Sequence, residues 1–314
     1  MIKATLATLA QQLNASPPAQ STDFSGISTD TRTLTPGNLY IAIRGEQFDG
    51  HQFVAEAAKK GAAAALVSEK VAVDLPQLMV DDTILALGNI AAQWRDQFVL
   101  PLIGVTGSNG KTTLKNMIAA ILRAACDNQA EKVLATEGNL NNNIGMPLNL
   151  ARLNAQHRYA VIEMGMNHFG EIEYLTKITR PHVALITNAG ASHLEGLGDV
   201  AGVARAKGEI FLGLQENGVA VLNRDDAFFP FWHSLIGKHK LITFGFHPDA
   251  DVSIISQPNQ NANQFTLRTP RGNIDITLPL LGRHNILNAL AAAAATTIIG
   301  IDLKASVFIT SIGC

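Results

Sequence analysis

Gly107-Ser108-Asn109-Gly110-Lys111-Thr112-Thr113 is the most informative segment of the 314-residue sequence. It follows an apolar run at 102–105 that predicts a buried strand, and apolar residues recur at helical spacing after it. A strand, a glycine turn, Lys-Thr and a helix, in that order, are typical of a loop that binds nucleotide phosphates. Glycines let backbone N–H groups approach the phosphates, Lys111 supplies a positive charge, and the Thr112 hydroxyl suits Mg²⁺.

This loop differs from the usual P-loop at one position. A standard P-loop has glycine six residues before its lysine, and Val105 stands there. The difference disfavours general nucleotide switches, motors and P-loop kinases. A glycine turn that binds no ligand is the alternative, but it leaves the Gly-Lys-Thr-Thr run at the start of a helix unexplained.

Length and composition favour two domains, because one domain takes about 100–200 residues. The chain is 47% hydrophobic and 16% charged, and its net charge of -2 gives no reason to expect nucleic-acid binding. No apolar run approaches the ~20 residues that cross a membrane, and the N-terminus does not resemble a signal peptide. Two cysteines, Cys126 and Cys314, are a poor basis for a disulfide framework. We expect a cytoplasmic monomer that is not an integral membrane protein.

The remaining pattern predicts an α/β fold with a small α/β domain at residues 1–82 and a central P-loop domain at 83–314. In the first domain we expect helices near 6–13 and 53–60 and strands near 38–43 and 63–67. A connecting helix is expected at about 83–98.

In the central domain, apolar segments alternate with helical ones, which predicts a mostly parallel sheet. Its expected strands lie at 102–105, 132–135, 159–163, 183–187, 219–222 and 241–244. Alternating segments on both sides of the turn at 270–272 predict a small antiparallel β extension. An alanine-rich helix is expected from 284 to about 299.

Ligands of parallel sheets bind at the carboxyl ends of the strands, and that rule brings the glycine loop, Glu163 and Asn188 to one edge. Glu163 ends an apolar strand, where its carboxylate suits Mg²⁺, and a solvated strand-end glutamate is the alternative. His193 follows another strand at the same edge, and packing is as plausible for it as a functional role.

Two further positions stay open on the residues alone. Lys207 lies in an amphipathic helix, where by itself it would be a solvated lysine. Asn285 and Asn288 lie one helical turn apart, and their amides suit the edge of an adenine ring. Helix capping by Asn285 is the alternative.

Six motifs in order resemble the Mur ligases, the ATP-dependent amide-bond ligases of peptidoglycan precursor synthesis. These motifs lie at 105–113, 138–147, 162–168, 193–196, 206–211 and 282–285, and the resemblance runs from residue 1 to about 304. Asn139 to Asn143 and His193 to Gly196 favour the branch that adds D-alanyl-D-alanine to UDP-N-acetylmuramoyl tripeptide. The nearest alternatives are a related ligase that adds lysine or diaminopimelate, and a folylpolyglutamate synthase.

The resemblance implies a role for each matching residue, with ATP and Mg²⁺ as cofactors. The expected ATP-binding residues are Gly107, Ser108, Asn109, Gly110, Lys111, Thr112, Thr113, Asn285 and Asn288. The expected catalytic residues are Lys111, Glu163, His193 and Lys207. Metal binding would fall to Thr112, Glu163 and His193, and to Lys207 if CO₂ carbamylates it.

Substrate binding is implied mainly in the first domain. The family's uridine-nucleotide pocket matches Ser28, Thr29, Asp30, Arg32, Arg44, Gly45, Asp49 and His51. Asn143 would contact phosphates or substrate near the metals.

The implied reaction has two steps. The carboxylate of the UDP-muramoyl tripeptide attacks the γ-phosphate of ATP and gives an acyl phosphate, which the amine of D-alanyl-D-alanine then attacks. The family has a third, Rossmann-like domain at its C-terminal end, and we expect this chain to lack it and to be inactive or nearly so alone. A non-catalytic nucleotide-binding fragment is therefore a further alternative.

Overall fold

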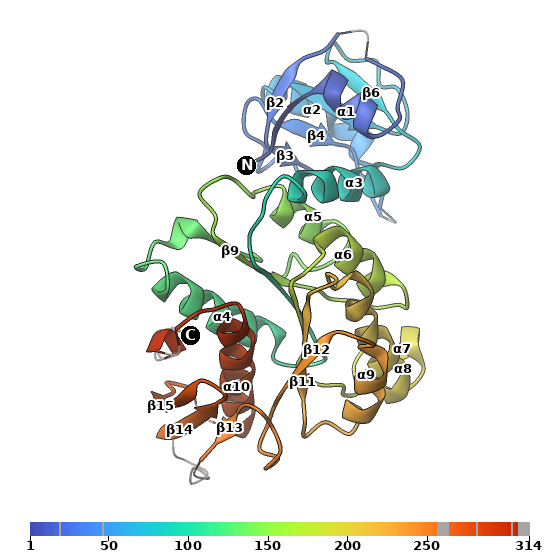
Figure 1. Cartoon of the computed structure of the whole chain (residues 1–314). Coiled ribbons are helices and arrows are strands. Elements are labelled where there is room, and N and C mark those ends of the chain that lie inside the picture. The colour runs from blue at the N-terminus through green and yellow to red at the C-terminus, as the bar shows by residue number, and fades with distance from the viewer. Residues whose placement is uncertain (19, 46, 256–263, 281, 303, 307–314) are drawn as a thin grey trace. The chain divides into compact units, whose positions relative to one another are not determined.

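The structure is a computed structural model that describes residues 1–18, 20–45, 47–255, 264–280, 282–302 and 304–306 (Figure 1). Cys314 lies outside these residues, and Cys126 is a buried free thiol. The chain forms two compact units, Met1–Val99 with Asn143–Ala155, and Leu100–Asn142 with Gln156–Cys314. Mixed helices and strands, a parallel main sheet and small antiparallel sheets confirm the expected fold class.

The compact units differ from the expected domain bounds at two places. Helix α3 (Thr83–Arg95) belongs to the first unit, because its Leu87 and Ile90 are buried in that unit's core. Residues 143–155 return to the same unit and include helix α5 (Gly145–Leu150). The backbone N–H of Ile2 donates to the carbonyl of Ala151 at 2.8 Å, which ties the returning segment to the N-terminus.

The first unit contains a four-stranded parallel sheet and a two-stranded antiparallel one. The parallel sheet has the order β3 (Ile27–Ser28), β4 (Leu39–Ile41), β5 (Ala64–Val67), β6 (Gln77–Met79). The antiparallel pair is β1 (Lys3–Thr5) with β2 (Asp23–Ser25). Its other helices are α1 (Leu6–Gln12), α2 (Val54–Lys59) and the 3₁₀ turn Gly50–Phe53.

Alternation along the central strands of this sheet builds two separate cores. Leu39, Ile41 and Leu66 face one side, where they pack in a cluster with residues of α1 and α3. Tyr40 and Val67 face the other side with residues of α2. Successive side chains of a strand point to opposite faces, so a strand buried on both faces reads as a continuous apolar run.

The second unit is built on a six-stranded sheet whose neighbours are all parallel. The strand order is β12 (Lys240–Phe244), β11 (Val219–Asn223), β10 (Val183–Ile186), β7 (Leu102–Thr106), β9 (Tyr159–Glu163), β8 (Val133–Ala135). All six strands expected from the sequence are present. Each differs from its expected bounds by at most one residue at either end.

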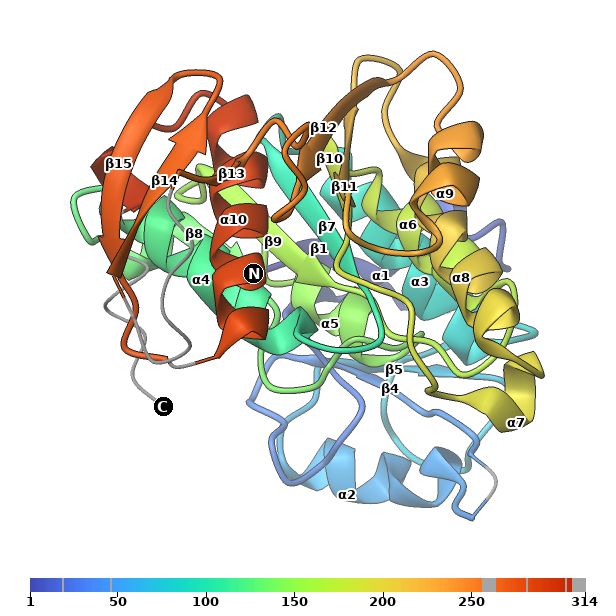
Figure 2. The ribbon, with the colours of Figure 1, turned by 90° about the horizontal axis from the view of Figure 1, so that it is seen from below.

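Helices cover both faces of this sheet. Helices α4 (Lys111–Ala124) and α10 (Arg283–Ile298) contact one face and pack against each other (Figure 2). The opposite face carries α6 (Glu171–Thr179), α8 (Val200–Gly208), α9 (Phe229–Leu235) and the 3₁₀ turn Glu209–Gly213. The short helix α7 (Leu194–Leu197) precedes α8, and the 3₁₀ turn Ala130–Lys132 precedes β8.

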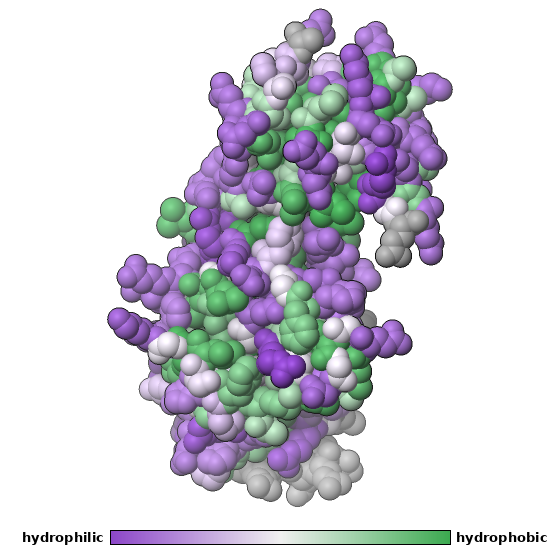
Figure 3. Space-filling view, turned by 90° about the vertical axis from the view of Figure 1, so that its right-hand side faces the viewer, coloured by the Kyte–Doolittle hydropathy of each residue, from purple (hydrophilic) through white to green (hydrophobic). Residues whose placement is uncertain are grey.

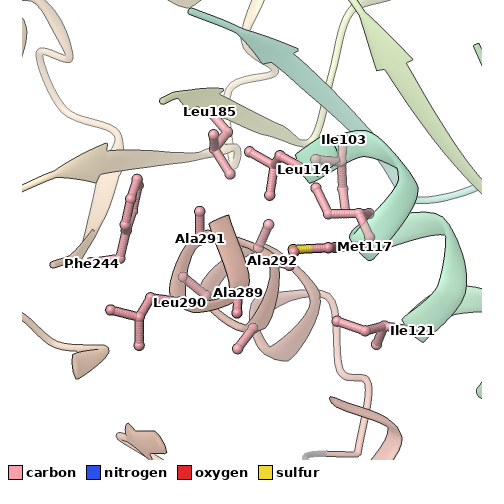
Figure 4. Close-up of a cluster of buried hydrophobic side chains, with 14 of the residues drawn as sticks. Ile103, Leu114, Met117, Ile121, Leu185, Phe244, Ala289, Leu290, Ala291 and Ala292 are labelled. Atoms are coloured by element: carbon pink, nitrogen blue, oxygen red, sulfur yellow. The ribbon is translucent and has the colours of Figure 1, made fainter. Parts of the chain in front are cut away.

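Helix α10 is buried almost all round, and alanine makes this possible. Residues Ala289 to Ala295 of this helix are each at most 1% exposed. Figure 4 shows the helix among larger side chains of the sheet and of α4, including Ile103, Met117, Leu185 and Phe244. Small side chains on α10 let it lie close to both the sheet and α4.

A small antiparallel sheet extends this unit. Strands β14 (Gln264–Thr269) and β15 (Gly272–Thr277) form the expected hairpin, and β13 (Ser253–Ile254) pairs with β14. On the face drawn in Figure 3, hydrophobic residues are interspersed with hydrophilic ones, as on protein surfaces generally. None of the helices in the described ranges combines the length and the hydrophobicity that a membrane-spanning segment needs.

Candidate active site

The glycine loop lies where connections of the main sheet leave in opposite directions. Strand β7 continues through the loop and α4 toward β8, whereas its neighbour β10 continues through α7 and α8 toward β11 on the other side. Such a point opens a crevice at the carboxyl ends of the two strands, where ligands of open parallel sheets bind. The register pairs Val105 with Glu163, so the end of β9 lies beside the start of the loop.

Two glycines in the loop adopt conformations that side chains rarely adopt. Gly107 has φ +150°, and a Cβ there would lie 1.7 Å from the Thr187 hydroxyl. Gly110 has φ +80°, and a Cβ there would lie 2.7 Å from the Asn288 amide oxygen. The loop therefore requires glycine at both positions, as the sequence predicted for a loop that exposes its backbone.

The loop after β10 holds the glycine loop in place. The N–H of Ser108 donates to the carbonyl of Asn188 at 3.0 Å, and the N–H of Asn109 donates to the Asn188 side chain at 3.1 Å. The Ser108 hydroxyl accepts from Gly190 N–H at 2.9 Å. The Thr187 hydroxyl donates to the carbonyl of Asn109 at 2.8 Å. These bonds join the two sides of the crevice and fix the loop before any ligand arrives.

Lys111 begins helix α4, and its ammonium turns back onto the loop. It donates to the carbonyl of Gly107 at 2.7 Å and lies 3.4 Å from that of Ser108. Burial lowers the pKa of Lys111, and the negative charge of Glu163 opposes this shift. A half-buried ammonium held by carbonyls can bind an anion, because the anion replaces weak neutral acceptors with a charge.

Glu163 is 1% exposed, and neutral groups hold both of its carboxylate oxygens. The Thr112 hydroxyl donates to one oxygen at 3.0 Å, and the Asn141 amide donates to the other at 2.8 Å. Its backbone N–H donates to the Thr136 hydroxyl at 2.9 Å. The Thr112 hydroxyl and a Glu163 carboxylate oxygen thus lie side by side, and both are ligand types that Mg²⁺ accepts.

Lys207 is an ionisable group buried inside this unit. Its side chain is buried at 2% exposure, although the sequence alone favoured a solvated lysine. Burial, and then the positive charge of Lys111, lower the pKa of Lys207 to about 7. Within the described residues Lys207 forms no ion pair, so the fold stabilises the neutral amine.

His193 lies near both lysines and lines a cavity. Burial, followed by the charges of Lys207 and Lys111, lowers its pKa, which favours the neutral, metal-binding imidazole. A cavity of about 560 Å³ is lined by His193 with Asn167, His168 and residues 194–196. The structure thus brings Lys111, His193 and Lys207 together.

Asn285 and Asn288 are both buried in the first turns of α10. The side chain of Asn288 lies against the glycine loop, as the short distance to a Cβ built on Gly110 indicates. The expected pair of asparagines therefore lies beside the expected phosphate loop. Contact with adenine stays a prediction.

In the first unit, most of the expected substrate residues form ion pairs with one another. Arg44 contacts Asp49 at 2.8 Å and Glu69 at 3.0 Å, and Asp49 accepts from the His51 ring at 2.6 Å. Hydrogen bonds from His51 lower the pKa of Asp49 to about 2. The other ring nitrogen of His51 accepts from Ser68 N–H at 2.9 Å. The group Asp49, His51 and Glu69 could by distance alone hold a metal ion, but Arg44 and Ser68 already bind its ligand atoms.

The other expected substrate residues of this unit lie in turns. Gly45 follows Arg44, and its N–H donates to the carbonyl of Phe48 at 2.9 Å. Arg32 pairs with Asp30 at 2.6 Å on the surface, and Ser28 donates to the carbonyl of Asp30 at 2.8 Å. Thr29 lies between Ser28 and Asp30.

Sequence reasoning missed three side chains of the second unit. Asn141 bonds Glu163 and was not among the expected residues. Asn143 is an exposed residue of the first unit, and its expected contact with phosphates or substrate stays a prediction. Thr136 was also missed. Asp226 accepts from Ala189 N–H at 3.0 Å, and burial raises its pKa. Its position shortly after β11, at the same sheet edge, was the signal available for it.

Comparison with known proteins agrees with this geometry. Residues 105–296 match the family model described as Mur ligase middle domain, and residues 23–95 match the one described as Mur ligase family, catalytic domain. The chain belongs to the Mur ligase family.

Its similar curated relatives include two ligases of the same description. The UDP-N-acetylmuramoyl-tripeptide–D-alanyl-D-alanine ligase of Escherichia coli (strain K12) is 48% identical over 309 residues, which are 97% of this chain and 67% of the relative. That of Haemophilus influenzae is 44% identical over 306 residues, 96% of this chain and 66% of the relative. The chain thus spans about two thirds of the length of these relatives.

Two solved structures resemble the chain along most of its length. A crystal structure of MurF from Acinetobacter baumannii has a TM-score of 0.92 at 36% identity and covers 100% of this chain and 69% of that one. MurF ligase from Thermotoga maritima, solved in complex with ADP, has a TM-score of 0.78 at 25% identity. The match covers 92% of this chain and 66% of that one.

Proposed function

We propose that this chain provides the nucleotide-binding and tripeptide-binding parts of an ATP-dependent ligase. The ligase would add D-alanyl-D-alanine to UDP-N-acetylmuramoyl tripeptide in peptidoglycan precursor synthesis. The names of the relatives support this substrate pair, and the ADP complex of the Thermotoga neighbour supports ATP. The observation that carries the proposal is the convergence of Lys111, Thr112 and Glu163 at the carboxyl end of β7.

The chain's own residues would bind and orient the polyphosphate. The first turn of α4 has no side-chain cap, so its N–H groups and the positive end of its dipole suit phosphate oxygens. Lys111 would exchange the carbonyls of Gly107 and Ser108 for an outer phosphate. Asn288, beside Gly110, would contact the nucleotide from α10.

The residues also fit a divalent cation. Thr112 and Glu163 offer two oxygens 3.0 Å apart, and His193 a neutral imidazole. Mg²⁺ bound there would reduce the repulsion between the substrate carboxylate and the γ-phosphate. The Asn141 amide would keep the Glu163 carboxylate oriented by its bond to the second oxygen.

Lys207 is suited to become a carbamate, because burial lowers the pKa of its amine to about 7 and much of the amine is therefore neutral at neutral pH. The amine lone pair would form a C–N bond to CO₂, one C=O electron pair would move to oxygen, and the nitrogen would lose a proton to solvent. The product is an anion, which would compensate the charge of Lys111 and bind or orient a cation.

The cytoplasmic location and the monomeric state of the protein stay predictions.

Calorimetric titration of the chain with ATP and Mg²⁺ tests the nucleotide part of the proposal. We expect saturable heat, and a loss of at least about 100-fold in affinity for Lys111→Ala, because a charged contact to phosphate is removed in a half-buried site. Lys177→Ala, an exposed lysine of α6 paired with Glu173, is the matched control and should bind ATP normally. Absence of heat at millimolar ATP would contradict the proposal.

Phosphate release tests the acceptor. With UDP-muramoyl tripeptide and ATP present, D-alanyl-D-alanine should release more phosphate than lysine or diaminopimelate at equal concentration. We expect low turnover from this chain by itself. A stronger response to lysine or diaminopimelate would assign the chain to another branch of the family.

A further inference from the structure

A second cavity lies at the opposite edge of the main sheet from the glycine loop. Its volume is about 760 Å³, within the roughly 300–1,000 Å³ typical of small-molecule pockets. It is lined at the amino ends of β10, β11 and β12, where Val183, Val219 and Lys240 begin these strands. The C-terminal end of α10 and the turn between β14 and β15 complete its walls.

The walls of this cavity are mostly aliphatic. Val183, Val219, Ile242, Val252, Ala294 and Ile298 contribute to the lining. The expected polyphosphate site of this unit has a glycine loop and a helix N-terminus without a side-chain cap. The lining of this cavity includes neither of them. This lining suits a ligand with an apolar body rather than a polyphosphate chain.

The charged residues of the lining have one sign. They are Lys240 and Arg271, and none of the described lining residues is acidic. Lys240 and Arg271 are exposed, and neither forms an ion pair within the part of the chain that the structure describes. One-sided charge at the opening of an apolar cavity favours a ligand with an anionic group.

One polar group of the lining lacks a partner. Thr297 is 7% exposed and lines the cavity. Its hydroxyl is buried and makes no hydrogen bond to any described residue. Buried polar groups of native proteins are usually hydrogen-bonded, and an unpaired one needs an explanation. A ligand oxygen that accepts from this hydroxyl would provide one.

We propose that this cavity is a second binding site, for a small amphipathic carboxylate whose aliphatic body fills the cavity and whose carboxylate meets Lys240 and Arg271. The site is independent of the ATP site, because the five-residue strand β7 between the two edges is about 16 Å long. Its occupant should therefore bind together with ATP rather than compete with it.

Decanoate is the probe for a calorimetric test on the whole chain. We expect saturable binding, weakened at least about tenfold in the double variant Lys240→Glu with Arg271→Glu, because two attractive charges become repulsive. The matched control is Lys238→Glu, an exposed lysine near the cavity that does not line it, and its affinity should stay within about twofold. Thr297→Val, which keeps the shape and removes the hydroxyl, should weaken binding by about threefold or more.

Three outcomes would overturn this proposal. One is the lack of saturable heat up to about 5 mM decanoate, where a millimolar site would be mostly filled. The second is equal binding of decyltrimethylammonium, since it would reveal an apolar surface without charge selection. The third is unchanged affinity in the double variant when thermal melting shows it folded. Lys111→Ala should keep decanoate binding while losing ATP binding, so that failure here and failure of the proposed function are told apart.

Discussion

The charged side chains around Asp49 in the first unit neutralise one another, whereas Lys207 of the second unit is buried without an ionic partner among the described residues. Arg44 pairs with Asp49 and Glu69, and Asp49 accepts from His51. The charged neighbour that acts on Lys207 is a cation, Lys111, which lowers its pKa further. A cluster that is complete by itself keeps its shape without a ligand. Protonating a buried amine that has no anionic partner costs free energy, which an incoming anion or a chemical modification can recover.

The largest effect that would test this contrast is expected at Lys207. The pKa of its amine is about 7 in the folded chain and near its ordinary 10.5 when unfolded. Between these values unfolding takes up a proton, so the free energy of unfolding rises with pH, by on the order of 1 kcal/mol per pH unit. Lys207→Met should remove that rise and stabilise the chain by about 3 kcal/mol at pH 7.

Urea unfolding between pH 7 and 10, in buffer free of CO₂ and of divalent metal, measures this. Lys177→Met, at an exposed position of α6, is the control and should leave the pH dependence as it is. A wild-type chain whose stability does not change over this pH range would show that the Lys207 amine is not held neutral by the fold.

A smaller effect is expected at Gly107. A Cβ at this position would meet the Thr187 hydroxyl at 1.7 Å, and the backbone has φ +150°. Gly107→Ala should therefore lower the free energy of unfolding by about 2 kcal/mol and weaken ATP binding, since the loop must shift. Gly190→Ala in the facing loop is the matched control, because the nearest atom to its Cβ would lie 3.5 Å away. Equal losses in the two variants, measured by thermal unfolding, would contradict the close approach at Gly107.

The smallest effect is expected in the self-neutralised cluster of the first unit. Asp49 has a folded pKa of about 2, below its ordinary 3.8, so its contribution is complete above pH 4 and is lost as the pH falls toward 2. Asp49→Asn should remove that acid-dependent loss and cost about 1 kcal/mol at pH 7, because the site is partly exposed and screened. Unfolding curves of Asp49→Asn from pH 2 to 7 measure this change in stability, and Asp74→Asn, at an exposed position, is the control. The same acid dependence in both would place the loss elsewhere.

The sequence predicted the strands and the glycine loop because both depend on local signals. The strands of the second unit are short apolar runs, and the loop needs glycine where its backbone turns. It did not predict that residues 143–155 return to the first unit, since this depends on contacts such as Ile2 with Ala151, which are distant in sequence. Periodicity identifies an apolar face but not its partner.

The sequence also predicted only those parts of the candidate site that depend on local signals. Glu163 follows from its place at the end of an apolar strand, and its bond to Thr112 agrees with the predicted sheet edge. Among successive asparagines, only the three-dimensional path of the loop decides that Asn141 bonds Glu163. Burial of Lys207 depends on packing around α8, which no single-sequence pattern contains.

The alanine-rich middle of α10 also limits how this protein can vary. Asn288 touches the glycine loop from the same helix whose next seven residues are at most 1% exposed, so the helix has no room to move outward or turn. Any side chain larger than a methyl group on its alanine face would displace the helix and carry Asn288 with it. Viable variants should therefore keep small residues there, and compensating changes should occur on α4 and the sheet.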